Sequence, residues 1–506
     1  MQWHLKSTTQ AICVGLLSLG LAGCFDSDSS SSDPEETATA DVRVIHAVAD
    51  APDVNASLND GGQVEGLAFT EATDLLEVPA DDYSVTVDAL LPEDGKSVDG
   101  VIDVDSLELA ENTETSILAV GSASDRVGGD TDAISPVVVV PPDEPIEDSK
   151  ARFNVVHAAE GAPEVDIYAT TPDNNSLGST PAITLAFGEQ ASAQLFSDPD
   201  REDVPPRRIR ITAAGADPSD DSNILFDSGA LPELPSGEDY VLAAINNTGA
   251  EDSPVRLLAV TGDSADDVAV FRDKDSQAAP KAGHFSPDAD SAVGPVNVTA
   301  GGSVPSPQFA NLEFQDVSGY IGVPAGDYDL NITDADNGQP ALLSEPVSAT
   351  LKGGDFVTGY AVGRASNSPE PLELILGTDP IRPVATEAQV RIVHAASGVP
   401  GANGEVDVYA GPSGGELGLV LEAVPYKAIP EYLSLAVDLE SGTSDYDFEV
   451  YPTGTDPDGN TPAIAVPGQT LSAGSVSTVV ARDVQGGGLS AQLIDDAGAV
   501  QTFKSN

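Results

Sequence analysis

Four histidines are the residues whose type and spacing most strongly suggest chemistry. The chain has 506 residues and five histidines, and four of these recur at intervals of about 110 to 130 residues within related phrases. They are His46 in RVIHAVADAPDVN, His157 in NVVHAAEGAPEVDIY, His284 in KAGHFSPDADSAVGPVNVT and His394 in RIVHAASGVPGANGEVDVY. A side chain that titrates near neutral pH can serve as a general base or as a metal ligand.

A zinc site at these histidines would need further ligands close by. Zinc takes three or four protein ligands, whereas each copy of the phrase contains one His and no Cys. The remaining ligands would have to be carboxylates such as Asp53, Asp166 and Asp407. Asp166 and Asp407 fall on the polar side of an alternating segment, where we expect exposure to solvent.

A structural role explains the histidines more simply. Val42, Val44 and His46 alternate along one strand, so the ring continues an apolar face into a loop. A buried imidazole needs a hydrogen-bond partner, and the nearest candidates are backbone groups of the Ala-Pro turn that follows. The pattern therefore favours four structural repeat histidines that brace their loops.

Calcium is the other ion that the sequence suggests. DADNGQ (334–339) and DPDGNT (456–461) place Asp334, Asp336, Asp456 and Asp458 at alternate positions before a glycine. Oxygen ligands begin to surround calcium in this way, but neither segment continues to the closing Glu of a twelve-residue loop. Asp, Asn and Gly also form turns, and a turn is the favoured interpretation of both segments. The sequence therefore predicts no definite cofactor, and calcium is the one candidate that it offers.

Catalysis finds little support in the sequence. It has no H-E-x-x-H or glycine-rich phosphate loop, and its serines do not recur in register with the histidines. We therefore predict a protein that is not an enzyme. The alternative is a hydrolase that uses the histidine-containing loop of each repeat.

The few basic residues occupy regular positions. The residue three before the histidine is Arg43, Lys281 or Arg391 in three copies and Asn154 in the second. A separate cluster comprises Arg201, Arg207, Arg208 and Arg210. The first set lies on the face opposite the histidine, and Arg208 and Arg210 alternate with Ile209 and Ile211, so we expect both sets on solvated strand faces. For the cluster, docking of a carboxylate partner or of a neighbouring unit is the alternative.

The elements that position these residues repeat with the histidines. Two further phrases follow each histidine. The first reads VPADDYSVTV, VPPRRIRI, VPAGDYDLNI and SGTSDYDFEVY in the four copies, and the second reads LAENTETSILAVG, LPSGEDYVLAAI, LKGGDFVTGYAVG and LSAGSVSTVVARD. Apolar residues alternate with period two, as in half-buried strands, and Gly or Pro recurs at the spacing of sandwich turns. Pro-rich or charged seams separate the copies, which predicts four domains strung like beads.

The N-terminus has the features of an export signal. A basic residue, Lys6, precedes an apolar stretch that is too short to span a bilayer. Leu21-Ala22-Gly23-Cys24 resembles a bacterial lipobox, in which the cysteine is lipidated. Cys13 leaves with the signal, so Cys24 is the only thiol of the mature chain. The predicted organisation is a signal peptide (1–23), a disordered tether (24–40) and four repeats (41–142, 150–273, a degenerate 280–380, and 386–506).

The repeated phrases resemble a bacterial family known as domain of unknown function 4397. They follow V-x-V-x-H-A-x-x-x-A-P-x-V-D-x-Y, then V-P-A-G-x-Y, then L-x-x-G, and cover essentially residues 41–506. The resemblance implies secreted or lipid-anchored proteins with immunoglobulin-like or transthyretin-like β domains, and it implies no reaction. The expected fold is therefore all-β, with four tandem sandwiches after a signal peptide and tether.

The charge restricts the partners. There are 21 basic and 83 acidic residues, for a formal net charge of −62. Such a surface repels nucleic acid and suits a saline or halophilic habitat, because salt screens the self-repulsion. We expect a lipid-anchored protein of the cell envelope, at the outer membrane, on its periplasmic face or at the cell surface. Its partners would be the membrane and a protein or polysaccharide ligand. Its role would be binding, adhesion or spacing. A calcium-stiffened stalk is a further alternative.

Overall fold

The structure is a computed structural model that describes residues 38–503, apart from 60–61, 93–95, 131–132, 197–207, 233, 251, 293, 337–339, 367–369, 400–403, 456, 486 and 496–499. The predicted signal peptide, Cys24 and nearly all of the predicted tether lie outside these residues. Over the described range, no helix has the length and hydropathy required to span a membrane.

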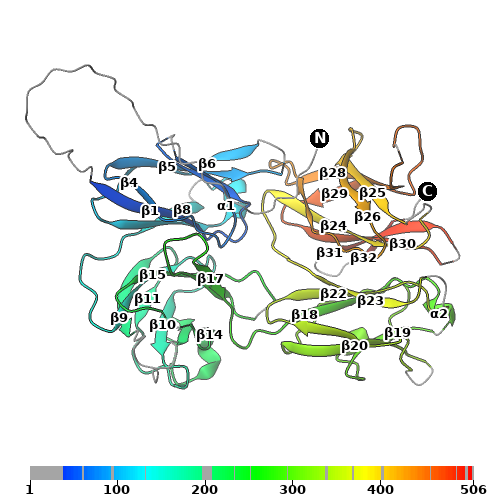
Figure 1. Cartoon of the computed structure of the whole chain (residues 1–506), viewed down its shortest axis with the longest axis horizontal. Helices are drawn as coiled ribbons and strands as arrows, with labels where there is room; N and C mark the ends of the chain where they lie inside the picture. The colour runs from blue at the N-terminus through cyan, green and yellow to red at the C-terminus, as the bar shows by residue number, and fades with distance from the viewer. Residues whose placement is uncertain are drawn as a thin grey trace, which may run out of the picture.

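The prediction of an all-β fold with four sandwiches is confirmed. Eight small sheets pair into four units, which we number in chain order (Figure 1). In every unit the strand that carries the histidine pairs in parallel with a later strand of the same sheet, as β1 does with β7. The two described α-helices are one turn long: α1 (Ala123–Val127) and α2 (Ala289–Ala292).

Units 1 and 2 have eight and nine strands. In unit 1 the sheets are ordered β4-β1-β7-β8 and β3-β2-β5-β6, from β1 (Thr39–His46), β2 (Val54–Leu58), β3 (Gly62–Leu67), β4 (Leu76–Pro79), β5 (Asp82–Leu90), β6 (Ser97–Glu108), β7 (Glu114–Gly121) and β8 (Ile134–Val139). In unit 2 they are ordered β12-β9-β15-β16-β17 and β11-β10-β13-β14, from β9 (Lys150–His157), β10 (Val165–Thr170), β11 (Ile183–Leu185), β12 (Gln190–Phe196), β13 (Arg208–Ala213), β14 (Ile224–Asp227), β15 (Asp239–Asn246), β16 (Val255–Val260) and β17 (Val268–Phe271).

Units 3 and 4 follow the same plan with six and nine strands. In unit 3 the sheets are ordered β18-β22-β23 and β19-β20-β21, from β18 (Ala279–His284), β19 (Val296–Ala300), β20 (Gly326–Asp334), β21 (Val347–Leu351), β22 (Phe356–Val362) and β23 (Glu373–Thr378). In unit 4 they are ordered β27-β24-β30-β31-β32 and β26-β25-β28-β29, from β24 (Glu387–Ala395), β25 (Val406–Pro412), β26 (Gly418–Val424), β27 (Leu433–Ala436), β28 (Thr443–Pro452), β29 (Ile464–Ser472), β30 (Val476–Asp483), β31 (Leu489–Asp495) and β32 (Val500–Phe503).

Each sandwich has its own apolar core between its two sheets. The predicted alternation is visible in β5, where Val85, Val87 and Ala89 are buried and the residues between them are half-buried. The histidine-bearing strands differ, because both of their faces are buried. In β9, every residue from Ala151 to His157 is buried. A strand that is apolar on both faces must be covered on both sides.

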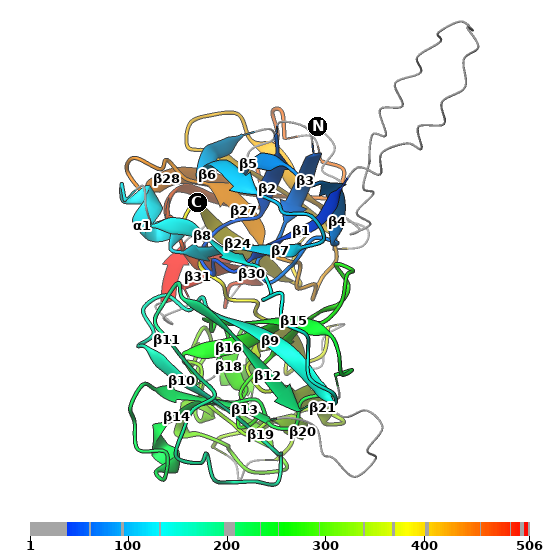
Figure 2. The ribbon, with the colours of Figure 1, turned by 90° about the vertical axis from the view of Figure 1, so that its left-hand side faces the viewer.

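Neighbouring units supply that second cover. Ile45 and Leu118 of unit 1 pack against Val156 and Val241 of unit 2 in one continuous apolar cluster. Units 3 and 4 form a second cluster of the same kind, which includes Tyr360. Figure 2 shows β1, β7 and β8 stacked above β9 and β15. The prediction of separate beads is therefore wrong.

Polar contacts join the two pairs into a two-by-two block (Figure 1). Arg272 of the seam after unit 2 donates to Asp355 of unit 3 at 2.7 Å. The seam between units 3 and 4 returns to unit 1, where Arg382 donates to the Ala51 carbonyl at 2.7 Å. Ala385 of the same seam is part of the apolar core of unit 1. Each unit therefore contacts two others, directly or through a seam.

Candidate functional site

The imidazoles of His46, His157, His284 and His394 are buried, each in its own unit. In three units the Nε2–H donates to a carbonyl of the following loop: Pro52 at 3.0 Å, Pro163 at 2.9 Å and Gly404 at 2.8 Å. The other nitrogen, Nδ1, accepts a backbone N–H two residues after the histidine in all four units, at 3.3–3.4 Å. In these three rings both nitrogens are therefore engaged by their own loop.

These hydrogen bonds require a neutral ring with its proton on Nε2. The pKa of His46 is lowered to about 4, chiefly because the ring is buried. The positive charge of Arg382 contributes to this shift, and the hydrogen bond to Pro52 opposes it. Burial also lowers the pKa of His394. A neutral imidazole whose nitrogens are both occupied has no lone pair to offer a substrate proton or a metal ion.

A second recurring element, which sequence analysis missed, holds each histidine from the other side. We call it the histidine turn: residues 68–71, 186–189, 313–316 and 425–428. Its third residue has a left-handed φ of 71–83° and donates its N–H to the histidine carbonyl at 2.7–2.9 Å. The histidine N–H donates in return to the carbonyl of the fourth residue, at 2.9–3.1 Å.

The second residue of the turn is an aromatic ring set edge-on to the imidazole. Phe69, Phe187, Phe314 and Tyr426 have ring centroids 5.8–6.3 Å from those of their histidines. The signal for the turn is present in the sequence as LAFTE, LAFGE and LEFQD. In these three turns the final acid accepts the N–H of the first residue, whereas the fourth turn begins with Pro425, which has no N–H to satisfy.

The carboxylates considered as zinc ligands also stabilise turns. Asp166 and Asp407 are buried, so the expectation that they are exposed is wrong. Asp166 accepts the N–H of Gly215 at 2.8 Å, and Asp407 accepts those of Ala423 and Gly454 at 2.8 and 2.9 Å. Asp53 lies half-buried in the loop after His46. Among the described residues, no group of three or more His, Cys, Asp or Glu is arranged to hold a metal ion.

The first proposed calcium loop begins as a turn. Asp334 is buried at the end of β20, and its carboxylate accepts the backbone N–H of Asp336 at 2.8 Å. The rest of that loop, 337–339, lies outside the described residues. So does Asp456 of the second loop, while Asp458 lies in the turn that follows it.

The expectation that the regular basic residues are solvated is wrong. Arg43, Lys281 and Arg391 are buried, because the strand face opposite the histidine packs against the partner unit or a seam. Arg43 donates to the Gly262 carbonyl of unit 2 at 2.6 Å. Arg391 pairs with Asp379 and donates to the Tyr360 hydroxyl of unit 3 at 3.1 Å.

The arginine cluster of unit 2 borders a large cleft. Arg208 and Arg210 are buried, which also contradicts the expected exposure, whereas Arg201 and Arg207 lie outside the described residues. Arg208 forms a bidentate pair with Asp227. Arg210 is held by the carbonyls of 174–176 and by Thr170. The cleft, about 1010 Å³ in volume, lies between units 2 and 3.

Comparisons with known proteins give one family match. The family model described as domain of unknown function (DUF4397) matches residues 40–168, 281–409 and 388–504, which together span more than half of the chain. The first two segments each begin in one unit and run into the next. No curated protein matches.

Two solved structures show a weak likeness. The Bacillus anthracis TIE protein is 11% identical, with 88% of this chain and 68% of that chain covered and a TM-score of 0.14. The product complex of a multi-modular glycogen-degrading pneumococcal virulence factor, SpuA, is 10% identical, with 83% and 37% covered and a TM-score of 0.17. At these TM-scores neither likeness supports an argument about function.

Proposed function

The chain belongs to the DUF4397 family, and from this premise we propose that it is a lipid-anchored, non-catalytic protein of the cell envelope whose four sandwiches serve in binding. The two-by-two block supports binding or adhesion over spacing, because units that fold back on one another reach less far than a linear string. The strongly acidic composition supports a saline habitat.

The single observation that carries this proposal is the engagement of the repeated histidines. They recur at the same position in every unit, and in units 1, 2 and 4 both ring nitrogens are hydrogen-bonded to backbone groups. A residue that braces its own loop contributes to folding. The regularity of the histidines is therefore explained without a reaction.

Substituting His157 with glutamine separates this role from the hydrolase alternative. We expect thermal denaturation at a lower temperature, by the equivalent of about 1–3 kcal/mol, because a buried hydrogen-bond pair is lost or distorted. Hydrolysis of p-nitrophenyl acetate by the purified protein should not change. A variant that keeps its melting temperature but loses turnover would support the hydrolase.

The anchor rests on the lipobox-like quartet before Cys24. Phe25 follows that cysteine, and an aspartate at this position would retain a lipoprotein at the inner membrane, so we propose the outer membrane. Cys24→Ser should move the protein from the membrane fraction to the soluble fraction. Cys13→Ser, which changes the segment removed with the signal, should leave fractionation unchanged. Retention of Cys24→Ser on membranes would contradict the anchor.

A further inference from the structure

The cleft between units 2 and 3 has walls that the chain itself holds in place. They come from β13, β14 and the turn between β15 and β16 in unit 2, from the seam at 273–277, and from Tyr320, Gly322 and Phe356 of unit 3. The Ala250 N–H donates to the Gly354 carbonyl of unit 3 at 3.1 Å, and the Lys274 N–H donates to the Asp227 carbonyl at 2.7 Å. A volume of about 1010 Å³ is at the upper end of the range for ligand sites, so several linked rings would fit.

The basic side chains of the cleft already have partners. Besides its pair with Asp227, Arg208 donates to the Pro172 carbonyl at 3.1 Å. Both terminal nitrogens of Arg210 donate to carbonyls of 174–176, and Lys274 forms an ion pair with Asp275. The aspartates on the same walls outnumber these three cations: Asp221, Asp227, Asp252, Asp273 and Asp275. An anionic ligand would have to displace an existing partner and approach walls of net negative charge.

Tyr320 and Phe356 form the aromatic part of the wall. Both are half-buried, and their rings meet edge to face with centroids 4.9 Å apart. The Tyr320 hydroxyl donates to Asp379 at 2.7 Å, and the ammonium of Lys281 lies 4.2 Å from the centroid of the ring. These contacts fix the orientation of the Tyr320 ring. They also place a positive charge against it, so a cationic ligand would be repelled at the aromatic part of the cleft.

Carboxylates at the exposed edge of the cleft supply hydrogen-bond acceptors. Asp221 and Asp252 both line the cleft and are exposed to solvent. An ionised carboxylate accepts hydrogen bonds and donates none, so it pairs with a ligand that has donors. A ligand that complements these walls is therefore uncharged, has an apolar face for the two rings, and carries several hydroxyl groups.

We propose that this cleft binds a neutral segment of a polysaccharide. The C–H face of a sugar ring would pack against Phe356 and Tyr320, and its hydroxyl groups would donate to Asp221 and Asp252. The proposal rests on the binding role proposed above and deepens it, because it selects a polysaccharide over a protein ligand. It makes no use of the membrane anchor, which fractionation tests separately.

Binding of the purified protein to an array of immobilised oligosaccharides tests the proposal. The array carries neutral hexose oligomers, uronic-acid oligomers and glucosamine oligomers, so it separates neutral, anionic and cationic ligands. We expect saturable binding to neutral oligomers. Binding to charged oligomers alone, or to none of the three classes, would overturn the proposal. Binding accompanied by release of reducing ends would support the cleft and contradict the non-catalytic role.

Two substitutions in the cleft locate the site. Phe356→Ala should weaken binding to the preferred neutral oligomer about tenfold, because the aromatic contact is lost. Asp252→Ala should weaken it about fivefold, because a charged acceptor for a hydroxyl group is lost. Asp252 is exposed, so its variant keeps the test valid if Phe356→Ala does not fold.

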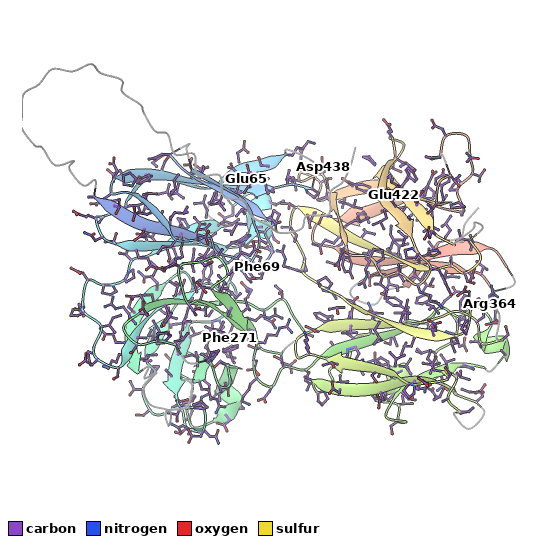
Figure 3. The ribbon with its side chains drawn as sticks, in the orientation of Figure 1. Glu65, Phe69, Phe271, Arg364, Glu422 and Asp438 are labelled. Atoms are coloured by element: carbon purple, nitrogen blue, oxygen red, sulfur yellow. The ribbon has the colours of Figure 1, made fainter. Side chains whose placement is uncertain are left out.

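Matched controls separate the cleft from nonspecific adsorption. Phe187→Ala removes an aromatic ring that is 39% exposed and lies outside the cleft. Glu422→Ala removes one exposed carboxylate from unit 4 (Figure 3). Both should change affinity less than twofold. If Phe356→Ala and Asp252→Ala bind as tightly as the parent protein, the cleft is not the site, although the binding role would stand.

Discussion

The ring of Phe285 occupies the space that a side chain on Gly283 would need. A Cβ at position 283 would be 2.5 Å from Cε2 of Phe285. In the other units the position of Gly283 is occupied by Ile45, Val156 or Val393, and the position of Phe285 is occupied by an alanine. Unit 3 therefore fills the same interface with the large and small residues exchanged, which explains why its histidine phrase looks degenerate.

This exchange predicts strong coupling between the two positions. Phe285→Ala should destabilise the interface between units 3 and 4 by about 3–5 kcal/mol through the cavity that it leaves. Gly283→Val alone should cost about 1–3 kcal/mol through overpacking. The double variant restores the arrangement of the other units, so its loss of stability should be smaller than the sum of the losses in the two single variants.

Hydrogen exchange of the amides in β18 and β24 is the suitable measurement, because a four-unit chain need not unfold in one step. Coupling of about 1 kcal/mol or more in the double-mutant cycle is expected for residues in contact. Strictly additive effects would contradict the proposed exchange.

The left-handed residue of the histidine turn allows a matched swap. Unit 1 has Thr70 at φ 75°, and unit 2 has Gly188 at φ 77°. A β-branched residue is strained in this region, whereas glycine is not. Thr70→Gly should therefore stabilise unit 1 by about 1 kcal/mol, and Gly188→Thr should destabilise unit 2 by a similar amount. Hydrogen exchange of the amides at His46 and His157 measures the local stability of the two units. A change of the same sign in both variants would refute the argument.

The lowered pKa of His46 predicts a loss of stability in mild acid. The unfolded chain takes up a proton near pH 6.5, whereas the folded chain resists protonation down to about pH 4. The contribution of this histidine is therefore fully present above pH 6.5 and falls by about 3 kcal/mol as the pH drops to 4. Melting temperatures measured between pH 7 and pH 4 should show this decline.

His46→Gln is the control for that decline, because glutamine does not titrate. The pKa values of Glu114 and Glu160 are raised by burial, so these acids favour the fold as the pH falls. The readout is therefore the difference in melting temperature between the parent protein and His46→Gln across the same pH range. A parent that declines no more than His46→Gln would contradict a buried neutral ring.

Period-two alternation was sufficient to predict the sandwiches, and the recurring histidine was sufficient to count them. The pairing of units was missed, although the apolar run Val155-Val156 beside His157 signals burial on both strand faces. Charged neighbours such as Arg43 indicate a solvated face by their type alone, but at the interface their charges are held by carbonyls and carboxylates. The histidine turn is hard to predict because it begins 22 to 31 positions after the histidine, with strands as well as loops between them.

The seam that closes the block gives the last prediction. Arg382 donates to the carbonyls of Ala49 and Ala51, and Ala385 donates its N–H to the Asp50 carbonyl at 2.8 Å. Arg382→Ala removes the two side-chain bonds and uncovers Phe69, so the contact between this seam and unit 1 should weaken. The radius of gyration in small-angle X-ray scattering should then increase as the two pairs separate. Lys352→Ala removes the same charge from an exposed position and should not change it. An unchanged radius for Arg382→Ala would show that the other contacts close the block without this arginine.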